Sequence, residues 1–389
     1  MKKANVYQTL ILLFVLVITG IPVAALQTYT PPDPTRPLDP VCDLAFSPDG
    51  RMIVAASGDG YLALWETDTG ALLHEFYNKD NCPSLIFSND SETLFTLYPG
   101  AIGGEYAETV LWDVQTGTEI RHFTGRGILS DDHQVLLTTG PDAPDRLWNV
   151  ATGQVIRSFN SSVHIQVGGV ISSDNSRLLS SNWPQRFPEL WDITTGEQEF
   201  AFPEGEGWIS WLQFLPDSQH ALVLYAPDGL ALWNLETLTQ QYVFPNSAIS
   251  ASLRQAESGN PLLIGYHDGS FLTWDVLSGE LTQQIRLTSP ISDEDIIGSQ
   301  LSNNGRVFLI ELKRGIVQLW DVETGTLRQQ FNPPANSSVD WSETRTQTAF
   351  SADDQYVLVG YSNEALHLWD AETGMEVRSY LLPPRSSGD

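Results

Sequence analysis

Residues that commonly carry chemistry are scattered in this chain of 389 residues. The seven histidines show no spacing typical of metal ligands, and no nucleophile, zinc or phosphate-loop motif occurs. The densest acidic cluster is Asp293-Glu294-Asp295, whose oxygens are of the type that divalent cations prefer. In so acidic a chain, a solvated loop is the simpler explanation of this cluster. We therefore expect no catalytic residues, no metal site and no cofactor.

The charge of the chain restricts its partners. It carries 48 acidic and 20 basic residues, a net charge of −28. Such a surface repels nucleic acid and anionic lipid headgroups. We therefore expect no nucleic-acid binding, and the charge would suit cationic partners, divalent ions or a salty medium.

The first 25 residues differ from the rest of the chain. Lys2 and Lys3 precede an apolar run from Leu10 to Val17, and the segment ends in Val23-Ala24-Ala25. This order is typical of a secretory signal peptide cleaved after Ala25. An uncleaved anchor is the alternative, although a bilayer span needs about 20 apolar residues. We expect a secreted or extracytoplasmic protein, with membrane contact only if residues 1–25 remain attached.

One motif, LWDVETG at residues 319–325, recurs along the chain with small changes. Asp, Asn or Glu follows the Trp in every copy, and a Thr-Gly or Ser-Gly pair follows in all copies but one, which has Thr237-Leu238. A fixed period of this length indicates a repeat architecture. The motif tryptophans, at intervals of 36 to 49 residues, are Trp65, Trp112, Trp148, Trp191, Trp233, Trp274, Trp320 and Trp369.

A single copy, residues 41–76, shows what each repeat builds. Its first apolar segment ends in Ser47-Pro48-Asp49-Gly50, a turn in which Pro presets the backbone and Gly supplies a positive φ. The continuous apolar run from Met52 to Ala56 indicates a strand covered on both faces. Two further turns separate two further strands. Each repeat is therefore a four-stranded antiparallel meander that must stack against its copies.

The Ser-Pro-Asp-Gly turn, the Leu-Trp-Asp and the period together resemble the WD-repeat family of β-propellers. The resemblance implies an all-β fold with eight four-stranded blades over residues 41–382, after a Pro-rich segment at 26–40 and before a tail at 383–389. The blades are expected to end near residues 77, 124, 159, 202, 245, 287, 331 and 382. The prolines exclude the segment before blade 1 as an inner strand. Blade 8 supplies its own outer strand, from Met375 to Leu382, so we expect the ring to close by packing. The Gly-His pair common in this family is missing, which predicts incomplete hydrogen-bond networks.

The repeat also indicates the role of the motif tryptophans and the positions of the two cysteines in the blades. A Trp that recurs once per blade at one strand position is expected to be a packing residue. Cys42 and Cys82 fall one register apart, at the starts of the innermost strands of adjacent blades. A bridge between them requires a Cα separation below about 7 Å. The sequence leaves open whether they form a disulfide or remain free thiols.

Binding is expected in the loops that do not repeat, because variable loops on a rigid scaffold usually carry recognition. These loops contain the aromatic residues outside the motif, and exposed Trp and Tyr are typical of interfaces and sugar sites. Burial of these aromatics by their own loops is the alternative. The candidates for partner binding are Trp183, Trp208, Trp211, Trp341, Tyr98 and Tyr106.

These features favour a non-catalytic scaffold that binds protein or peptide partners. Glycan binding through the additional tryptophans is a second hypothesis. A third is an enzyme, because Trp-Asp-x-x-Thr-Gly is similar to the repeat of quinoprotein dehydrogenase propellers, which also have eight blades. That family usually has Ala or Leu before the Asp and a neighbouring Cys pair near its redox cofactor. This chain has neither feature.

Overall fold

The computed structural model describes residues 41–382 except for 59, 78–81, 99–106, 141–142, 160–167, 182–186, 204–207, 227–228, 245–247, 254–260, 267–269, 287–294, 334–345 and 362–364. The described residues all lie within one compact unit, Leu38–Pro383. The expected signal peptide, Pro-rich segment and tail lie outside them.

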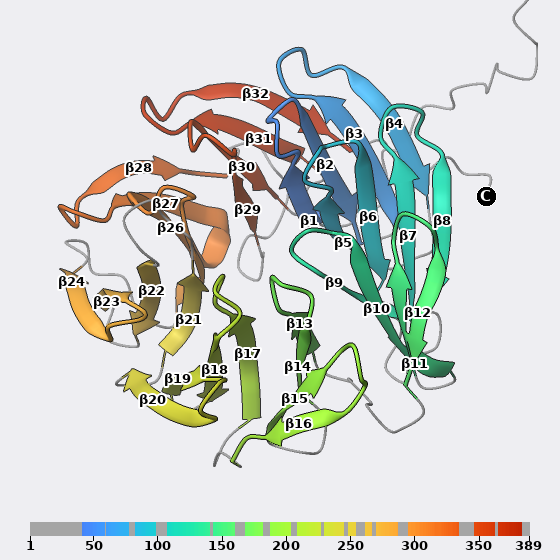
Figure 1. Ribbon diagram of the computed structural model, residues 1–389. Helices are drawn as coiled ribbons and strands as arrows, with labels where there is room; N and C mark the ends of the chain where they lie inside the picture. Colours follow the sequence, from blue (N-terminus) through green and yellow to red (C-terminus); the bar gives the residue numbers. More distant parts are fainter. Residues whose placement is uncertain are drawn as a thin grey trace, which may run out of the picture. The chain divides into compact units, whose positions relative to one another are not determined.

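Strands β1 to β32 form eight four-stranded antiparallel sheets, each built from four consecutive strands (Figure 1), which confirms the predicted all-β fold. We number these sheets blades 1 to 8 in chain order. The first strands are β1 (Val41–Phe46), β5 (Ser84–Phe87), β9 (Arg126–Leu129), β13 (Gly168–Ile171), β17 (Trp208–Phe214), β21 (Ala248–Leu253), β25 (Ile296–Leu301) and β29 (Gln347–Phe350). The second strands are β2 (Met52–Ser57), β6 (Thr93–Tyr98), β10 (Val135–Gly140), β14 (Arg177–Ser181), β18 (His220–Ala226), β22 (Pro261–Tyr266), β26 (Val307–Leu312) and β30 (Tyr356–Gly360).

The third strands are β3 (Tyr61–Glu66), β7 (Glu108–Asp113), β11 (Ala143–Asn149), β15 (Pro188–Asp192), β19 (Gly229–Asn234), β23 (Ser270–Asp275), β27 (Ile316–Asp321) and β31 (Ala365–Asp370). The fourth strands, which lie at the periphery in Figure 1, are β4 (Leu72–Tyr77), β8 (Glu119–Thr124), β12 (Gln154–Ser158), β16 (Gln198–Ala201), β20 (Thr239–Phe244), β24 (Glu280–Arg286), β28 (Leu327–Phe331) and β32 (Glu376–Leu381). The short 3-10 helix η3 (Lys313–Gly315) joins β26 to β27.

Polar side chains stabilise turns in several of the blades that the structure describes. In blade 1 the Ser47 hydroxyl donates to Asp49 at 2.6 Å and accepts the backbone N–H of Met52 at 2.9 Å. In blade 2 the motif Asp113 accepts the backbone N–H of Thr116 at 2.7 Å and its hydroxyl at 2.8 Å. The Asp of Trp-Asp-x-x-Thr-Gly is therefore the acceptor that closes its turn.

A β-bulge recurs at one place in every blade, where the strand register shifts just before the motif Trp. In blade 1, Leu64 pairs with His74 and Trp65 pairs with Leu72, so Leu73 is left without a partner in the ladder. A bulge of this kind bends the fourth strand and increases its twist.

Hydrophobic clusters join each blade to the next around the ring. Eight clusters of buried residues each combine side chains from two neighbouring blades, and one of them combines blade 8 with blade 1. In several of them the motif Trp packs against an aromatic residue near the end of the preceding fourth strand. Phe76 and Trp112 have ring centroids 5.0 Å apart, and Phe331 and Trp369 are 5.3 Å apart.

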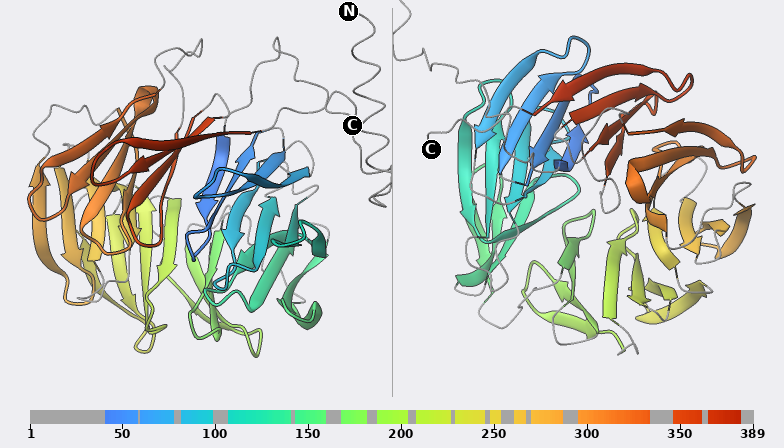
Figure 2. Two further views of the ribbon diagram at one scale, coloured as in Figure 1. Left: turned by 90° about the horizontal axis from the view of Figure 1, so that it is seen from above. Right: turned by 180° about the vertical axis from the view of Figure 1, so that it is seen from behind.

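Blade 8 contacts blade 1 in the same way as the other neighbours contact each other, and the two lie side by side in both views of Figure 2. Tyr380 and Trp65 have ring centroids 5.7 Å apart. The Arg378 guanidinium donates to the backbone oxygens of Asp68 and Thr69 at 2.7 and 2.8 Å. All four strands of blade 8 come from β29 to β32, so the ring closes by packing between faces.

The Gly of each Thr-Gly turn leaves room for a side chain from the preceding blade. Gly117 has a φ of +68°, and a Cβ on it would lie 2.5 Å from the His74 ring of blade 1. His74 also bonds the backbone oxygen of Gln115 at 3.0 Å. Blade 5 has Leu238 in place of this Gly, with a φ of +56°, and there Leu238 packs in a cluster that includes Phe200 of blade 4.

Candidate functional site

The motif tryptophans are structural in this fold. Trp320 is 0% exposed, and the others, such as Trp112, are buried or partly buried. The indole N–H of Trp112 donates to Thr96, and that of Trp148 donates to Thr138. Within the described part of the chain, the indole N–H groups of Trp233, Trp274 and Trp369 have no acceptor. The hydrogen-bond network around the motif is thus incomplete, and packing holds the tryptophans in place.

The residues suggested for partner binding divide into two groups. Trp183, Trp341 and Tyr106 lie outside the described residues, and for Trp208 only the backbone, at the start of β17, is described. Trp211 is partly buried against a cluster shared by blades 5 and 6. Tyr98 is 1% exposed at the end of β6. Expecting Tyr98 in a contact loop was wrong, because β6 extends further than the sequence suggested and places the ring in the core.

No metal site emerges in the described ranges, where no three His, Cys, Asp or Glu side chains are grouped to hold an ion. Asp295 is exposed just before β25, whereas Asp293 and Glu294 lie outside those ranges. The described histidines contact nearby groups. His220 lies 2.7 Å from Asp217, His122 lies 2.9 Å from Glu108 and His367 lies 2.8 Å from Glu376. Each pair lies within one blade, an arrangement that supports its strands.

Among the described residues, no helix is long and apolar enough to cross a bilayer.

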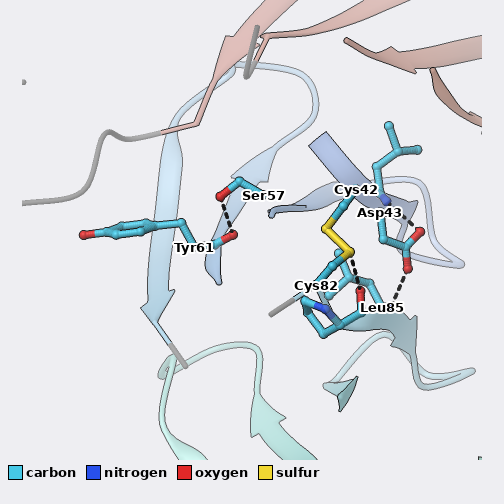
Figure 3. The surroundings of a disulfide bond; sticks show 8 residues. Cys42, Asp43, Ser57, Tyr61, Cys82 and Leu85 are labelled. Atoms are coloured by element: carbon cyan, nitrogen blue, oxygen red, sulfur yellow. Dashed lines mark hydrogen bonds between the residues drawn. A yellow bond between two sulfur atoms is a disulfide. The ribbon is translucent and has the colours of Figure 1, made fainter. Parts of the chain in front are cut away.

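Cys42 and Cys82 are joined by a disulfide between blades 1 and 2, shown in Figure 3. Their Cα atoms are 6.0 Å apart, within the separation that a bridge requires. Asp43, the next residue, extends to the same seam. Its carboxylate accepts the backbone N–H of Leu85 in β5 at 2.7 Å and that of Leu44 at 2.9 Å. One covalent bond and one carboxylate therefore connect the first strands of the two blades.

Two partly buried carboxyls lie at seams between blades. Burial raises the pKa of Asp43 to about 6, although the N–H groups of Leu85 and Leu44 favour its charged form. Burial also raises the pKa of Glu311, in β26 of blade 7, which accepts the hydroxyl of Thr348 from blade 8 at 2.6 Å. Both side chains connect neighbouring blades, and neither belongs to the repeated motif.

We expect Asp43 to make the protein more stable in mildly acidic solution than at neutral pH. Its folded pKa of about 6 lies above the ordinary value of 3.8, so the fold binds this proton more tightly than the unfolded chain does. The resulting stabilisation is complete below about pH 4 and is lost as the pH rises through 6. It amounts to at most about 3 kcal/mol. Urea unfolding of the protein and of Asp43→Asn between pH 4.5 and 7 measures this effect, and equal slopes against pH would contradict it.

Eight radially packed, four-stranded sheets with buried motif tryptophans define a β-propeller. Two family models match the sequence. One, described as outer membrane protein assembly factor BamB, covers residues 142–380, and one described as WD domain, G-beta repeat covers residues 33–66. The chain belongs to the propeller family of the first model, which spans more than half of it, and its repeats are WD repeats.

Relatives and solved structures agree with this assignment. Autophagy-related protein 16 of Arabidopsis thaliana is 24% identical over 76% of this chain and 49% of its own length. Small ribosomal subunit protein RACK1y of Oryza sativa subsp. japonica is 29% identical over 64% of this chain and 74% of its own length. The chain thus spans about half of the Arabidopsis relative.

Two structures show the same fold at low identity. The C-terminal WD40 domain of Sif2 is 17% identical, with a TM-score of 0.64 over 86% of this chain and 96% of that chain. The dihydro-heme d1 dehydrogenase NirN is 14% identical, with a TM-score of 0.66 over 94% of this chain and 77% of that chain. The fold is therefore common to WD-repeat proteins and to at least one enzyme.

Proposed function

We propose that the protein is a non-catalytic scaffold outside the cytoplasm that binds protein or peptide partners. The observation that carries this proposal is that the residues of the repeated motif serve to build the blades. Motif carboxylates such as Asp113 close turns, and motif tryptophans such as Trp320 are buried. The repeated residues thus build a rigid ring, and we expect the loops that do not repeat to bind partners.

Three further observations support the location and the partner class. Residues 1–25 have the layout of a signal peptide. The Cys42–Cys82 bridge suits an oxidising compartment. The family model that covers residues 142–380 is named for assembly of proteins at the outer membrane, and RACK1y is named for a ribosomal subunit. One name refers to protein assembly and the other to membership of a ribosomal subunit.

Capture of partners by the full chain tests the proposal. The immobilised protein is incubated with extracellular and envelope fractions of its source, next to a variant with Trp183→Ala and Trp208→Ala. We expect specific proteins to be retained by the native chain and lost from the variant, while the thermal midpoints of the two differ little. A variant that unfolds much earlier but retains the same proteins would show that these tryptophans are core residues. Binding of the native chain to a glycan array, with no protein retained in the capture experiment, would favour the glycan hypothesis.

An enzyme is the second candidate, because NirN shares the fold and the repeat is similar to that of quinoprotein dehydrogenases. Absorbance of the purified protein for bound quinone, with and without added calcium, distinguishes this candidate. A stoichiometric quinone chromophore would overturn the scaffold proposal.

A further inference from the structure

The turns between the first and second strands of neighbouring blades are joined to each other by hydrogen bonds, which we call collar bonds. Wherever both turns of a neighbouring pair are described, at least one collar bond crosses between them, with a single exception. Around the ring from blade 1, the collar bonds run from Asp49 to Ser91, from Asn89 to Asp131, from Asn175 to Asp132, from Asp174 to Ser218, and from Asn303 and Asn304 to Asp354.

The exception is the junction between blade 8 and blade 1, where no collar bond joins the described residues. In blades 2 and 5 the acceptor is the hydroxyl of Ser91 or Ser218, with backbone φ values of +64° and +54°. Blade 1 has Gly50 at this place in its turn, with a φ of +72°, and a Cβ on it would meet nothing within 4 Å. The corresponding donor is the backbone N–H of Asp353, for which the described residues provide no acceptor. One link of the collar is therefore missing at Gly50.

Blade 1 is joined more strongly to its other neighbour, blade 2. The Cys42–Cys82 bridge connects the two blades, and the Asp43 carboxylate accepts the N–H of Leu85 at 2.7 Å (Figure 3). On the side of blade 8, the described part of this first strand has a single backbone contact, in which the Val41 nitrogen lies 3.4 Å from the Tyr361 oxygen. That distance is longer than a typical N–H···O bond.

Blade 8 is likewise joined more strongly to blade 7. The Thr348 hydroxyl of its first strand donates to Glu311 at 2.6 Å. The Asp354 carboxylate accepts the backbone N–H groups of Asn303 at 2.9 Å and Asn304 at 2.8 Å. Both blades that meet at the closure of the ring therefore have stronger bonds to their other neighbours, close to their inner strands.

The periphery of the junction between blades 8 and 1 resembles that of other junctions. Arg378 bonds the Thr-Gly turn of the following blade, as Arg121 and Gln329 do from the same position of their own fourth strands. Tyr380 adds a bond to the backbone oxygen of Thr67 at 2.8 Å. The difference is thus confined to the inner strands and their turns, and the outer strands are well placed to stay together.

We infer that the ring opens between blades 8 and 1, on the face that carries Gly50, about a hinge formed by their outer strands. Blade 1 then moves with blade 2, and blade 8 moves with blade 7. Local openings of this kind follow the least stabilised contacts of a fold. The inference does not depend on the proposed scaffold function and adds a conformational change to the propeller.

Labelling of introduced thiols measures the opening, because the protein has no free cysteine. Leu358→Cys reports on the junction between blades 8 and 1, and Leu309→Cys is its matched control between blades 7 and 8. Both leucines are 0% exposed at the same place of their second strands. Each variant reacts with N-ethylmaleimide without denaturant, and mass spectrometry of the intact protein follows the reaction.

A second pair of variants serves if the Leu variants do not fold. Ala55→Cys faces blade 8 and Ala221→Cys faces blade 4, and both alanines are 0% exposed on second strands. These substitutions remove no packing atoms. The junction of blades 4 and 5 has its collar bond at Ser218, so it is a suitable reference.

We expect the Leu358→Cys variant to be labelled at least about tenfold faster than the Leu309→Cys variant. Adding Gly50→Ser to Leu358→Cys supplies the missing hydroxyl and should slow labelling about fivefold, the effect of one hydrogen bond. Adding Gly50→Ala instead restricts the backbone without a hydroxyl and should leave the rate nearly unchanged.

Equal labelling rates in the two members of a pair would overturn the inference. The same conclusion would follow if Gly50→Ser and Gly50→Ala altered the rate equally, or if every thiol reacted only at the rate of global unfolding.

Discussion

Replacing Trp320 by Ala should lower the free energy of unfolding by about 4 kcal/mol. The Trp320 side chain is 0% exposed, and it packs in a cluster with Ile285 of the preceding blade. Its indole N–H donates to Gln318 at 3.1 Å, so truncation also leaves a buried amide oxygen without this donor. Equilibrium unfolding in urea measures the loss.

Leu381→Ala is the matched control for Trp320→Ala, because it also shortens a large apolar side chain of a repeated strand. Leu381 is 70% exposed, so its truncation should change the free energy of unfolding by less than about 0.5 kcal/mol. Similar losses in the two variants would show that the motif Trp does not hold the blades together. Loss of partner binding by Trp320→Ala while folded would give the motif a recognition role.

Removing the Cys42–Cys82 bridge should destabilise the protein by a similar amount. The bridge closes a loop with a sequence separation of 40, for which the loss of loop entropy corresponds to about 4 kcal/mol. The expected result for Cys42→Ala with Cys82→Ala is a lower urea midpoint together with faster hydrogen exchange at Leu85, whose N–H donates to Asp43 across the same seam.

The native protein treated with reductant is the control for the double Ala variant. The two should unfold at the same urea concentration, because both lack the bridge and retain the rest of the seam. An unchanged midpoint in the variant would contradict a stabilising bridge. Two free thiols in the mass of the untreated protein would contradict the bridge itself.

The strands could be read from the sequence because each is bounded by turn residues with distinct backbone preferences. The predicted blade ends, near residues 77, 124, 159, 202, 245, 287, 331 and 382, fall within one residue of the ends of the eight fourth strands. Closure without exchange of a strand also followed from the sequence, since prolines precede blade 1 and apolar residues continue to Leu382.

Contacts between blades could not be predicted in the same way, because they depend on how far each sheet twists. The sequence showed that Phe often ends the repeat, yet only the structure pairs Phe76 with Trp112 of the next blade. The 6.0 Å between Cys42 and Cys82 is likewise a consequence of that geometry. Tyr98 was misplaced because an inserted loop and the end of a strand look alike in sequence.

The bulges of the fourth strands could not be predicted from the sequence for a related reason. One additional residue between the Thr-Gly turn and the fourth strand is indistinguishable from a slightly longer connection. The register of Leu64 with His74 and of Trp65 with Leu72 is what reveals that Leu73 is left over.

The junction between blade 8 and blade 1 makes the blade at which the chain starts physically arbitrary. Tyr380 packs on Trp65 and Arg378 bonds the turn at Thr69, just as other fourth strands contact the following motif. A circular permutant, opened between any two other blades and joined through a linker from Leu382 to Val41, would keep the side-chain contacts at every junction between blades. The energy of closure therefore resides in neighbour contacts, and the covalent path of the chain determines only which blade is made first.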